Sequence, residues 1–103
     1  MNNSFYFSIV IPAYNCEKTI QGTLASITNQ TFSNYEVIII NDGSTDGTEK
    51  KVNEYIGEHP NFSVFSFQNN GPGNAIHIGI AKAKGKYLFF VVPADALVIL
   101  HLE

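Results

Sequence analysis

The stretch "YEVIIINDGSTDGTEKK", residues 35–51, changes abruptly from an apolar run to Asn, Asp, Gly, Ser and Thr. A continuous run of β-branched residues is typical of a strand that is covered on both faces of a sheet. Asp and Gly favour a turn, and Ser44, Thr45 and Asp46 are of the residue types that cap the first turn of a helix. The stretch therefore predicts a buried strand, a polar loop and a helix, in that order.

The same alternation of strand and helix patterns extends along the chain. Three other short runs, rich in β-branched and aromatic residues, predict strands: "YFSIVIP", "FSVFSFQ" and "KYLFFVV". The segments between them show helical spacing of apolar residues, at Ile20, Leu24 and Ile27, at Val52, Tyr55 and Ile56, and at Ile76, Ile80 and Ala83. Alternating strands and helices with short loops predict a Rossmann-like, three-layer α/β/α fold with a mainly parallel sheet.

Capping residues agree with this assignment of helices. Asn15 is predicted to cap the first helix, as a polar residue that precedes its apolar stripe. Gly57 and Pro60 are predicted to end the second helix, and Gly85 the third. Each helix is therefore expected to be short and bounded by loops.

Composition limits the classes of protein to which the chain can belong. Its 103 residues allow one domain, residues 1–103, and 45% hydrophobic with 15% charged residues is the balance of a globular protein. A net charge of −3 excludes the basic footprint of a nucleic-acid-binding protein. The single cysteine, Cys16, excludes an internal disulfide. The N-terminal segment lacks the pattern of a signal peptide or membrane span, and we expect a cytoplasmic location.

The C-terminal tail "PADALVILHLE" restarts a hydrophobic pattern and then stops. We expect from this that the chain is a truncated part of a longer protein, and that its last strand is left uncovered. An uncovered strand and the apolar run "ALVILHL" would favour self-association.

Polar loops follow all four predicted strands: "PAYN", "NDGSTDG", "NNGPGN" and "PAD". The carboxyl ends of parallel strands share one edge of the sheet, where ligands bind. Asp42 can accept a hydrogen bond from a neutral N–H donor such as a nucleobase imide, and Gly43 allows a ligand to approach the backbone. The same residues also suit a plain turn before a helix. A phosphate cradle is a weaker interpretation, because a carboxylate repels an anion, and the glycine patterns of dinucleotide and P-loop sites are absent from the sequence.

Three blocks of sequence carry a resemblance to a known family. They are "FSIVIPAYN", "SITNQTFSNYEVIIINDGSTDGT" and "NNGPGNAIHIGIAKAKGKYLFFVV", which occur in the family's order within residues 5–92. Together they resemble the N-terminal, nucleotide-sugar-binding half of the family 2 inverting glycosyltransferases, which have the GT-A fold. The resemblance implies that the acceptor-binding half of such an enzyme is absent from this chain.

The resemblance also implies which residues bind a nucleotide. The loop after the first strand, Pro12 to Asn15 with Ala13 and Tyr14, would pack on the nucleoside, and Tyr14 would flank it. Asp42 would bind the base, with Gly43 beside it. Asn41 stands where the family has another aspartate, and its amide can still hold the loop. An arginine that the family usually carries in the third helix is replaced by the run Ala75–Gly79.

The implied metal site departs furthest from the family pattern. The family places aspartates just after the fourth strand to hold Mg²⁺ or Mn²⁺ against the diphosphate. An ungapped alignment puts Val92 and Ala94 on the first two aspartates and leaves only Asp95 as a metal ligand. A single carboxylate predicts weakened metal binding.

Two functions from different classes remain open on the sequence. The first is a fragment of a glycosyltransferase whose parent transfers a sugar from a nucleotide-diphosphate sugar to a sugar or lipid-linked acceptor hydroxyl, with inversion. Such a parent would act in polysaccharide biosynthesis, in the cytoplasm or at a membrane, and the fragment alone is expected to be inactive. The second is a non-catalytic binding or assembly module with a degraded metal site. A receiver-type or flavodoxin-like domain is a third, disfavoured interpretation.

Overall fold

The computed structural model describes residues 5–29, 34–68, 72–93 and 99–101. In chain order these form β1 (Phe5–Ala13), α1 (Ile20–Thr28), β2 (Tyr35–Asp42), α2 (Thr48–Ile56), β3 (Phe62–Phe67), α3 (Pro72–Lys82), β4 (Gly85–Val91) and β5 (Ile99–His101). The predicted alternation of four strands with three helices is confirmed, and β5 was not predicted.

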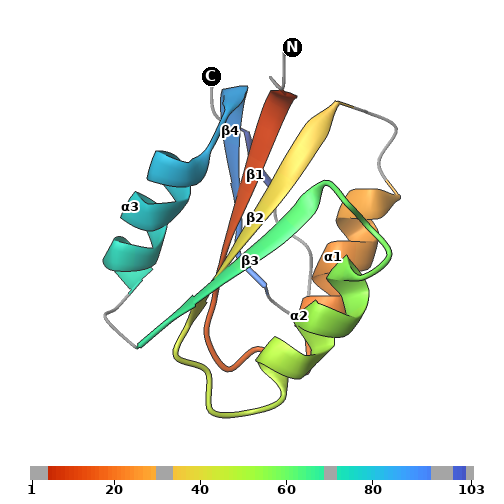
Figure 1. Ribbon diagram of the computed structural model, residues 1–103, viewed down its shortest axis with the longest axis vertical. Helices are drawn as coiled ribbons and strands as arrows, with labels where there is room; N and C mark the ends of the chain where they lie inside the picture. The colour runs from red at the N-terminus through yellow and green to blue at the C-terminus, as the bar shows by residue number, and fades with distance from the viewer. Residues whose placement is uncertain (1–4, 30–33, 69–71, 94–98, 102–103) are drawn as a thin grey trace.

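The strands form one sheet in the order β3-β2-β1-β4-β5. Strands β1 to β4 are parallel, and β5 is antiparallel to β4. Helices α1 and α2 cover one face of the sheet and α3 covers the other, which confirms the predicted three-layer fold (Figure 1). The expectation that β4 is left uncovered is wrong, because Ile99–His101 pairs with its free edge. The order of the strands reverses between β1 and β4.

The apolar run of β2 is continuous because its two faces belong to two cores. Val37 and Ile39 lie in the larger core, together with Leu24 of α1 and Val52 of α2. Ile38 and Ile40 face the other way and pack with α3. Side chains alternate between the faces of a strand. Both faces of β2 are therefore buried from solvent, one in each core.

The buried face of α3 differs from the predicted one. Ile76 and Ile80 are exposed, whereas Ala75 is buried against Ile38 and Ile40. Gly79 is also on the buried face, and a Cβ atom there would collide with Val10. The helix lies against the sheet through Ala75 and Gly79, with Ile78 half-buried beside them, and Ile76 and Ile80 are left outside.

Three predicted helix boundaries are also wrong. Helix α2 begins at Thr48 with Gly47 before it, and none of Ser44, Thr45 and Asp46 is therefore its cap residue. Helix α1 begins at Ile20, with Thr19 before it, and Asn15 therefore does not cap it. Helix α3 ends at Lys82, and Gly85 is the first residue of β4. Gly57 follows the last residue of α2 as predicted.

A buried hydrogen-bond network joins β1, β2 and β4 near their amino ends. Oε2 of Glu36 accepts hydrogen bonds from Oγ of Ser8 and from the backbone N–H of Lys84, both at 2.6 Å. Oγ of Ser8 in turn accepts one from the backbone N–H of Gly85, at 2.6 Å. The network leaves no room at Gly85, where a Cβ atom would lie 2.5 Å from Ser8 Oγ and 2.6 Å from the backbone of β1.

Replacement of Gly85 by Ala should therefore destabilise the fold. We expect Gly85→Ala to lower the free energy of unfolding by about 1–3 kcal/mol, the usual cost of overpacking. Urea denaturation measures this cost. The matched control is Gly22→Ala, in the first turn of α1, where a Cβ meets nothing within 4 Å. This variant should gain about 0.5 kcal/mol. Equal stability of the two variants would contradict the prediction.

Candidate functional site

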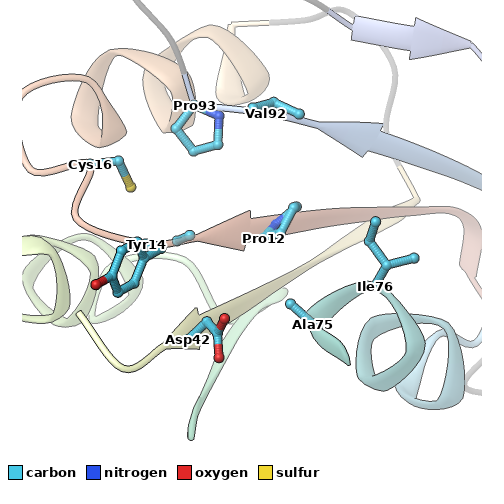
Figure 2. Close-up of a pocket in the computed structure, with 9 residues that line it drawn as sticks. Pro12, Tyr14, Cys16, Asp42, Ala75, Ile76, Val92 and Pro93 are labelled. Atoms are coloured by element: carbon cyan, nitrogen blue, oxygen red, sulfur yellow. The ribbon is translucent and has the colours of Figure 1, made fainter. Parts of the chain in front are cut away.

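A cavity of about 460 Å³ lies where β1, β2 and β4 end and α3 begins. Figure 2 shows that its walls come from segments far apart in the sequence. The segment at the end of β1 provides Pro12, Ala13, Tyr14 and Cys16, and β2 provides Asp42. Helix α3 provides Ala75 and Ile76, and the end of β4 provides Val92 and Pro93. The cavity occupies the point where the strand order reverses, which is the usual ligand position in an open parallel sheet.

Asp42 and Tyr14 are the two polar side chains best suited to a planar ligand. Asp42 is the last residue of β2 and only 5% exposed, whereas Tyr14 follows β1 and is 49% exposed. A carboxylate accepts hydrogen bonds from N–H groups, and an aromatic ring offers a face for stacking. Together they provide an edge contact and a face contact for a heterocycle.

Four of the predicted site residues meet at this cavity and three make contacts elsewhere. Pro12, Ala13, Tyr14 and Asp42 line it. Asn15 has a φ of 47°, and its Oδ1 accepts a hydrogen bond from the backbone N–H of Thr45 at 2.8 Å. Asparagine tolerates this left-handed conformation better than most residues.

Asn41 and Gly43 shape the loop that follows β2. Oδ1 of Asn41 accepts a hydrogen bond from the backbone N–H of Ser44, and its Nδ2 donates to Oγ of Ser66, both at 3.3 Å. Gly43 has a φ of 76°, which favours glycine. Asn41 thus joins the loop to β3, and Gly43 allows the backbone to turn. The predicted role of both residues in nucleotide binding stays a prediction.

The loops after β1 and β2 are held together by hydrogen bonds. The backbone N–H of Cys16 donates to Oγ1 of Thr48 at 2.8 Å, and that of Gly47 donates to Oε1 of Glu17 at 3.0 Å. Nζ of Lys51 donates to the backbone carbonyl of Glu17 at 2.7 Å. These bonds fix the segment that presents Tyr14 to the cavity.

Five residues of the cavity were not predicted as site residues. Cys16 was considered only as a cysteine without a partner for an internal disulfide, and burial raises the pKa of its thiol, which stays neutral near pH 7. Ala75 and Ile76 lie at the start of α3, and Val92 and Pro93 follow β4. Val92 and Pro93 could have been found because they follow a strand at its carboxyl end. Ala75 and Ile76 could have been found only with the strand order known, because α3 begins beside that edge of the sheet.

The described residues do not fit a divalent metal. Asp95, the predicted ligand, lies outside the described residues. Val92, which aligns with the first implied aspartate, is an apolar part of the cavity wall. Over residues 5–29, 34–68, 72–93 and 99–101 there is no cluster of three or more His, Cys, Asp or Glu side chains that could hold a metal ion.

Comparison with known proteins identifies the family. The model of the family described as "Glycosyl transferase family 2" matches residues 8–95. The chain belongs to glycosyl transferase family 2. A chondroitin synthase of Pasteurella multocida is 43% identical over 81 residues, which are 79% of this chain and 8% of that protein. The chain thus spans less than a tenth of this relative's length.

Solved structures confirm that this family 2 chain has the GT-A fold. TarS of S. aureus, residues 1–349, was solved in complex with UDP; it is 33% identical, with a TM-score of 0.80 over 86% of this chain and 27% of that one. GalNAc-T7, solved with UDP, GalNAc and Mn²⁺, is 29% identical, with a TM-score of 0.76 over 89% of this chain and 18% of that one. The receiver-type interpretation is therefore wrong.

Asp46, in the loop after β2, predicts a pH dependence of stability. Hydrogen bonds from the hydroxyl and backbone N–H of Thr48 and from the backbone N–H of Glu17 hold the pKa of Asp46 below its ordinary value of 3.8. A lowered pKa contributes stability that is complete above the unfolded value and lost as pH falls through the folded value. We expect Asp46→Asn to unfold at lower urea than the wild type at pH 7, and the difference to shrink below pH 4.

Urea midpoints measured between pH 7 and pH 3 test this expectation. The control is Glu54→Gln, an exposed carboxylate of α2, whose midpoint should follow that of the wild type. A constant difference between Asp46→Asn and the wild type across this range would contradict the assignment.

Proposed function

We propose that the chain is the N-terminal, nucleotide-sugar-binding part of a longer inverting glycosyltransferase. The observation that carries the proposal is that Asp42 and Tyr14 line one cavity where the strand order reverses. The 33% identical TarS was solved with UDP, and a further TarS structure with UDP-GlcNAc, which supports a nucleotide sugar as the ligand class. The relatives are much longer than this chain, which supports its interpretation as one domain of a larger protein.

Each predicted residue has a proposed role. Asp42 accepts an N–H hydrogen bond from the base, and Tyr14 flanks the ring. Pro12 and Ala13 form the wall under the nucleoside, whereas Asn15, Asn41 and Gly43 hold the two loops. Mg²⁺ or Mn²⁺ at Asp95 is the implied cofactor, supported by Mn²⁺ in GalNAc-T7, and we propose weaker metal binding here because the described residues do not fit it.

The longer protein would transfer a sugar to an acceptor hydroxyl. Direct displacement with inversion needs a carboxylate base beside the acceptor, and the acceptor-binding half would supply it. The chondroitin synthase and a teichoic acid biosynthesis protein of Bacillus subtilis, 37% identical over 95 residues, support a role in polysaccharide biosynthesis. A sugar or lipid-linked acceptor is the corresponding part of the proposal.

The cellular location is also a proposal. Of the helices that the structure describes, none has the length and apolar character to cross a lipid bilayer. We propose a cytoplasmic location, with any membrane contact made by other parts of the longer protein. Self-association through the tail stays a prediction, and residues 94–98 lie outside the described residues.

One observation favours a second candidate function, a non-catalytic module that binds a ligand or assembles with a partner. Val92 and Pro93 form an apolar wall at the end of β4, where the family pattern has carboxylates. A protein that has lost its metal ligands can keep the fold and the base contact while it loses transfer. Sugar transfer by the longer protein, measured with radiolabelled donors, distinguishes the two.

Nucleotide binding tests the proposed function directly. Isothermal titration of the chain with uridine, guanosine and their diphosphates, with and without Mn²⁺, should show binding in at least one base series. Asp42→Asn should weaken that binding about tenfold, because a charged acceptor is replaced by a neutral one. Tyr14→Ala should weaken it by a similar factor through lost stacking, about tenfold.

The control is Tyr6→Ala, an exposed tyrosine that is not among the residues of the cavity wall. It should bind the nucleoside like the wild type. If no nucleoside or diphosphate binds at millimolar concentration, the proposed function is wrong.

A further inference from the structure

Helix α3 lies over β1 and β2. It meets β1 where Gly79 faces Val10, and it meets β2 through Ala75. A helix with its side chains is about 10 Å wide and strands lie about 4.8 Å apart, so that one helix covers about two strands. On the opposite face of the sheet, α1 and α2 lie side by side (Figure 1). By this measure a second helix would be needed to cover β4 on the α3 face.

The α3 face of β4 carries large apolar side chains that are incompletely buried. Phe90 pairs with Val10 of β1, and partners in a parallel pair of strands point to the same face of the sheet. Leu88 shares this face because it is two residues before Phe90. Both side chains are half-buried, and neither is a core residue of the described part of the chain. Phe89 and Val91, which point the other way, are buried in the larger core.

The neighbouring side of α3 is apolar as well. Ile76 and Val92 line the same cavity, and this side of α3 therefore faces the end of β4. Ile80 is one turn further along the same side of the helix. These three side chains are exposed, Ile76 by 36%, Ile80 by 46% and Val92 by 52%. Together with the two half-buried residues of β4 they form what we call the α3–β4 surface: Ile76, Ile80, Leu88, Phe90 and Val92.

The amino end of β4, at one end of this surface, is basic. Residues 72–93 include three lysines, Lys82, Lys84 and Lys86, and no Asp or Glu. All three lysines are exposed. The carboxylate of Glu36, which accepts a hydrogen bond from the backbone N–H of Lys84, is buried. The charge that these residues present to a partner is therefore positive, and a partner with carboxylates at this end would be favoured.

We propose that an amphipathic helix from another part of the longer protein packs on the α3–β4 surface, with carboxylates next to the three lysines. The inference rests on the proposed function, because the longer protein supplies this helix. The match with TarS, residues 1–349, covers 27% of that chain, and the remainder is long enough to provide one. Strand β4 has 7 residues, a length of about 23 Å that a helix of about 15 residues matches.

The two levels of the surface favour a helix over a flat partner. Leu88 and Phe90 lie at the level of the sheet, whereas Ile76 and Ile80 belong to the helical layer above it. A flat membrane that touches α3 does not reach the sheet beside it, but a helix laid on β4 contacts both levels. Ile76 and Val92 also belong to the cavity wall. The packed helix would therefore border the candidate site and fix the rest of the enzyme relative to it.

Thiol reactivity tests the proposal. In a Cys16→Ser background, Ile80→Cys should react with a maleimide at the rate of an exposed thiol in the 103-residue chain. In the longer protein the same thiol should react about tenfold more slowly, because the packed helix covers it. The control is Glu54→Cys, at an exposed position of α2 on the opposite face of the sheet. This thiol should react at the same rate in both proteins.

The outcomes separate this inference from its rivals and from the proposed function. Equal rates for Ile80→Cys in the chain and in the longer protein would overturn the inference. Protection that needs phosphatidylglycerol vesicles would overturn it in favour of a membrane, and protection that is lost on dilution would overturn it in favour of a second copy. Nucleotide titration tests the proposed function separately, because Ile80 is not among the residues of the cavity wall.

A charge placed at residue 80 gives a second, independent test. In the 103-residue chain, Ile80→Lys should leave the midpoint of thermal unfolding unchanged, because this position is exposed there. In the longer protein the midpoint should fall by about 5 °C, because the charge would be buried under the helix. Glu54→Lys is the matched control and should change neither midpoint. Equal midpoints for Ile80→Lys and the wild type of the longer protein would contradict the proposal.

Discussion

The buried carboxylate of Glu36 joins the amino ends of three neighbouring strands, and the position of the cavity depends on this connection. It accepts hydrogen bonds from Ser8 of β1 and from the backbone just before β4. A buried charge is costly unless such donors satisfy it. The donors here come from strands on either side of the reversal in strand order, and this carboxylate therefore favours β4 beside β1. The register from Phe5 with Gly85 to Val10 with Phe90 then brings the segment that follows β4 beside the carboxyl end of β1.

The order of elements could be predicted because it is encoded locally. The run from Val37 to Ile40 is apolar at every position, as a strand between two helical layers requires. The buried face of α3 could not be predicted in the same way. Large apolar residues dominate a periodicity argument, and Ile76 with Ile80 gave the wrong face. The closest contact is made by Ala75 and Gly79, with Ile78 half-buried beside them. Close approach to Val10 is a property of the tertiary structure, and the helical pattern alone does not contain it.

The same distinction between local patterns and tertiary contacts applies to the residues of the candidate site. Asp42 could be predicted from the sequence because it ends a strand, at the carboxyl edge of a parallel sheet, which is the expected place for a ligand. Tyr14 directly follows a strand at the same edge, and its predicted role came from the family resemblance. Asn15 was assigned to a helix cap on local grounds. Its partner is Thr45, 30 residues away, in the loop after the next strand. Ala75 and Val92 can be assigned to the cavity only when the positions of α3 and β4 beside β1 are known.

The two ends of the cavity are under different constraints. At the end of β2, Asn41 bonds to Ser44 and Ser66, and Gly43 needs its left-handed backbone. Changes at these residues would disturb the loop that positions Asp42. Val92, at the end of β4, belongs to neither hydrophobic core and is half exposed. A substitution there alters the chemistry offered to a ligand at little cost to the fold. The end of the cavity at Asp42 is therefore constrained by the fold, whereas the end at Val92 can change its chemistry while the fold is kept.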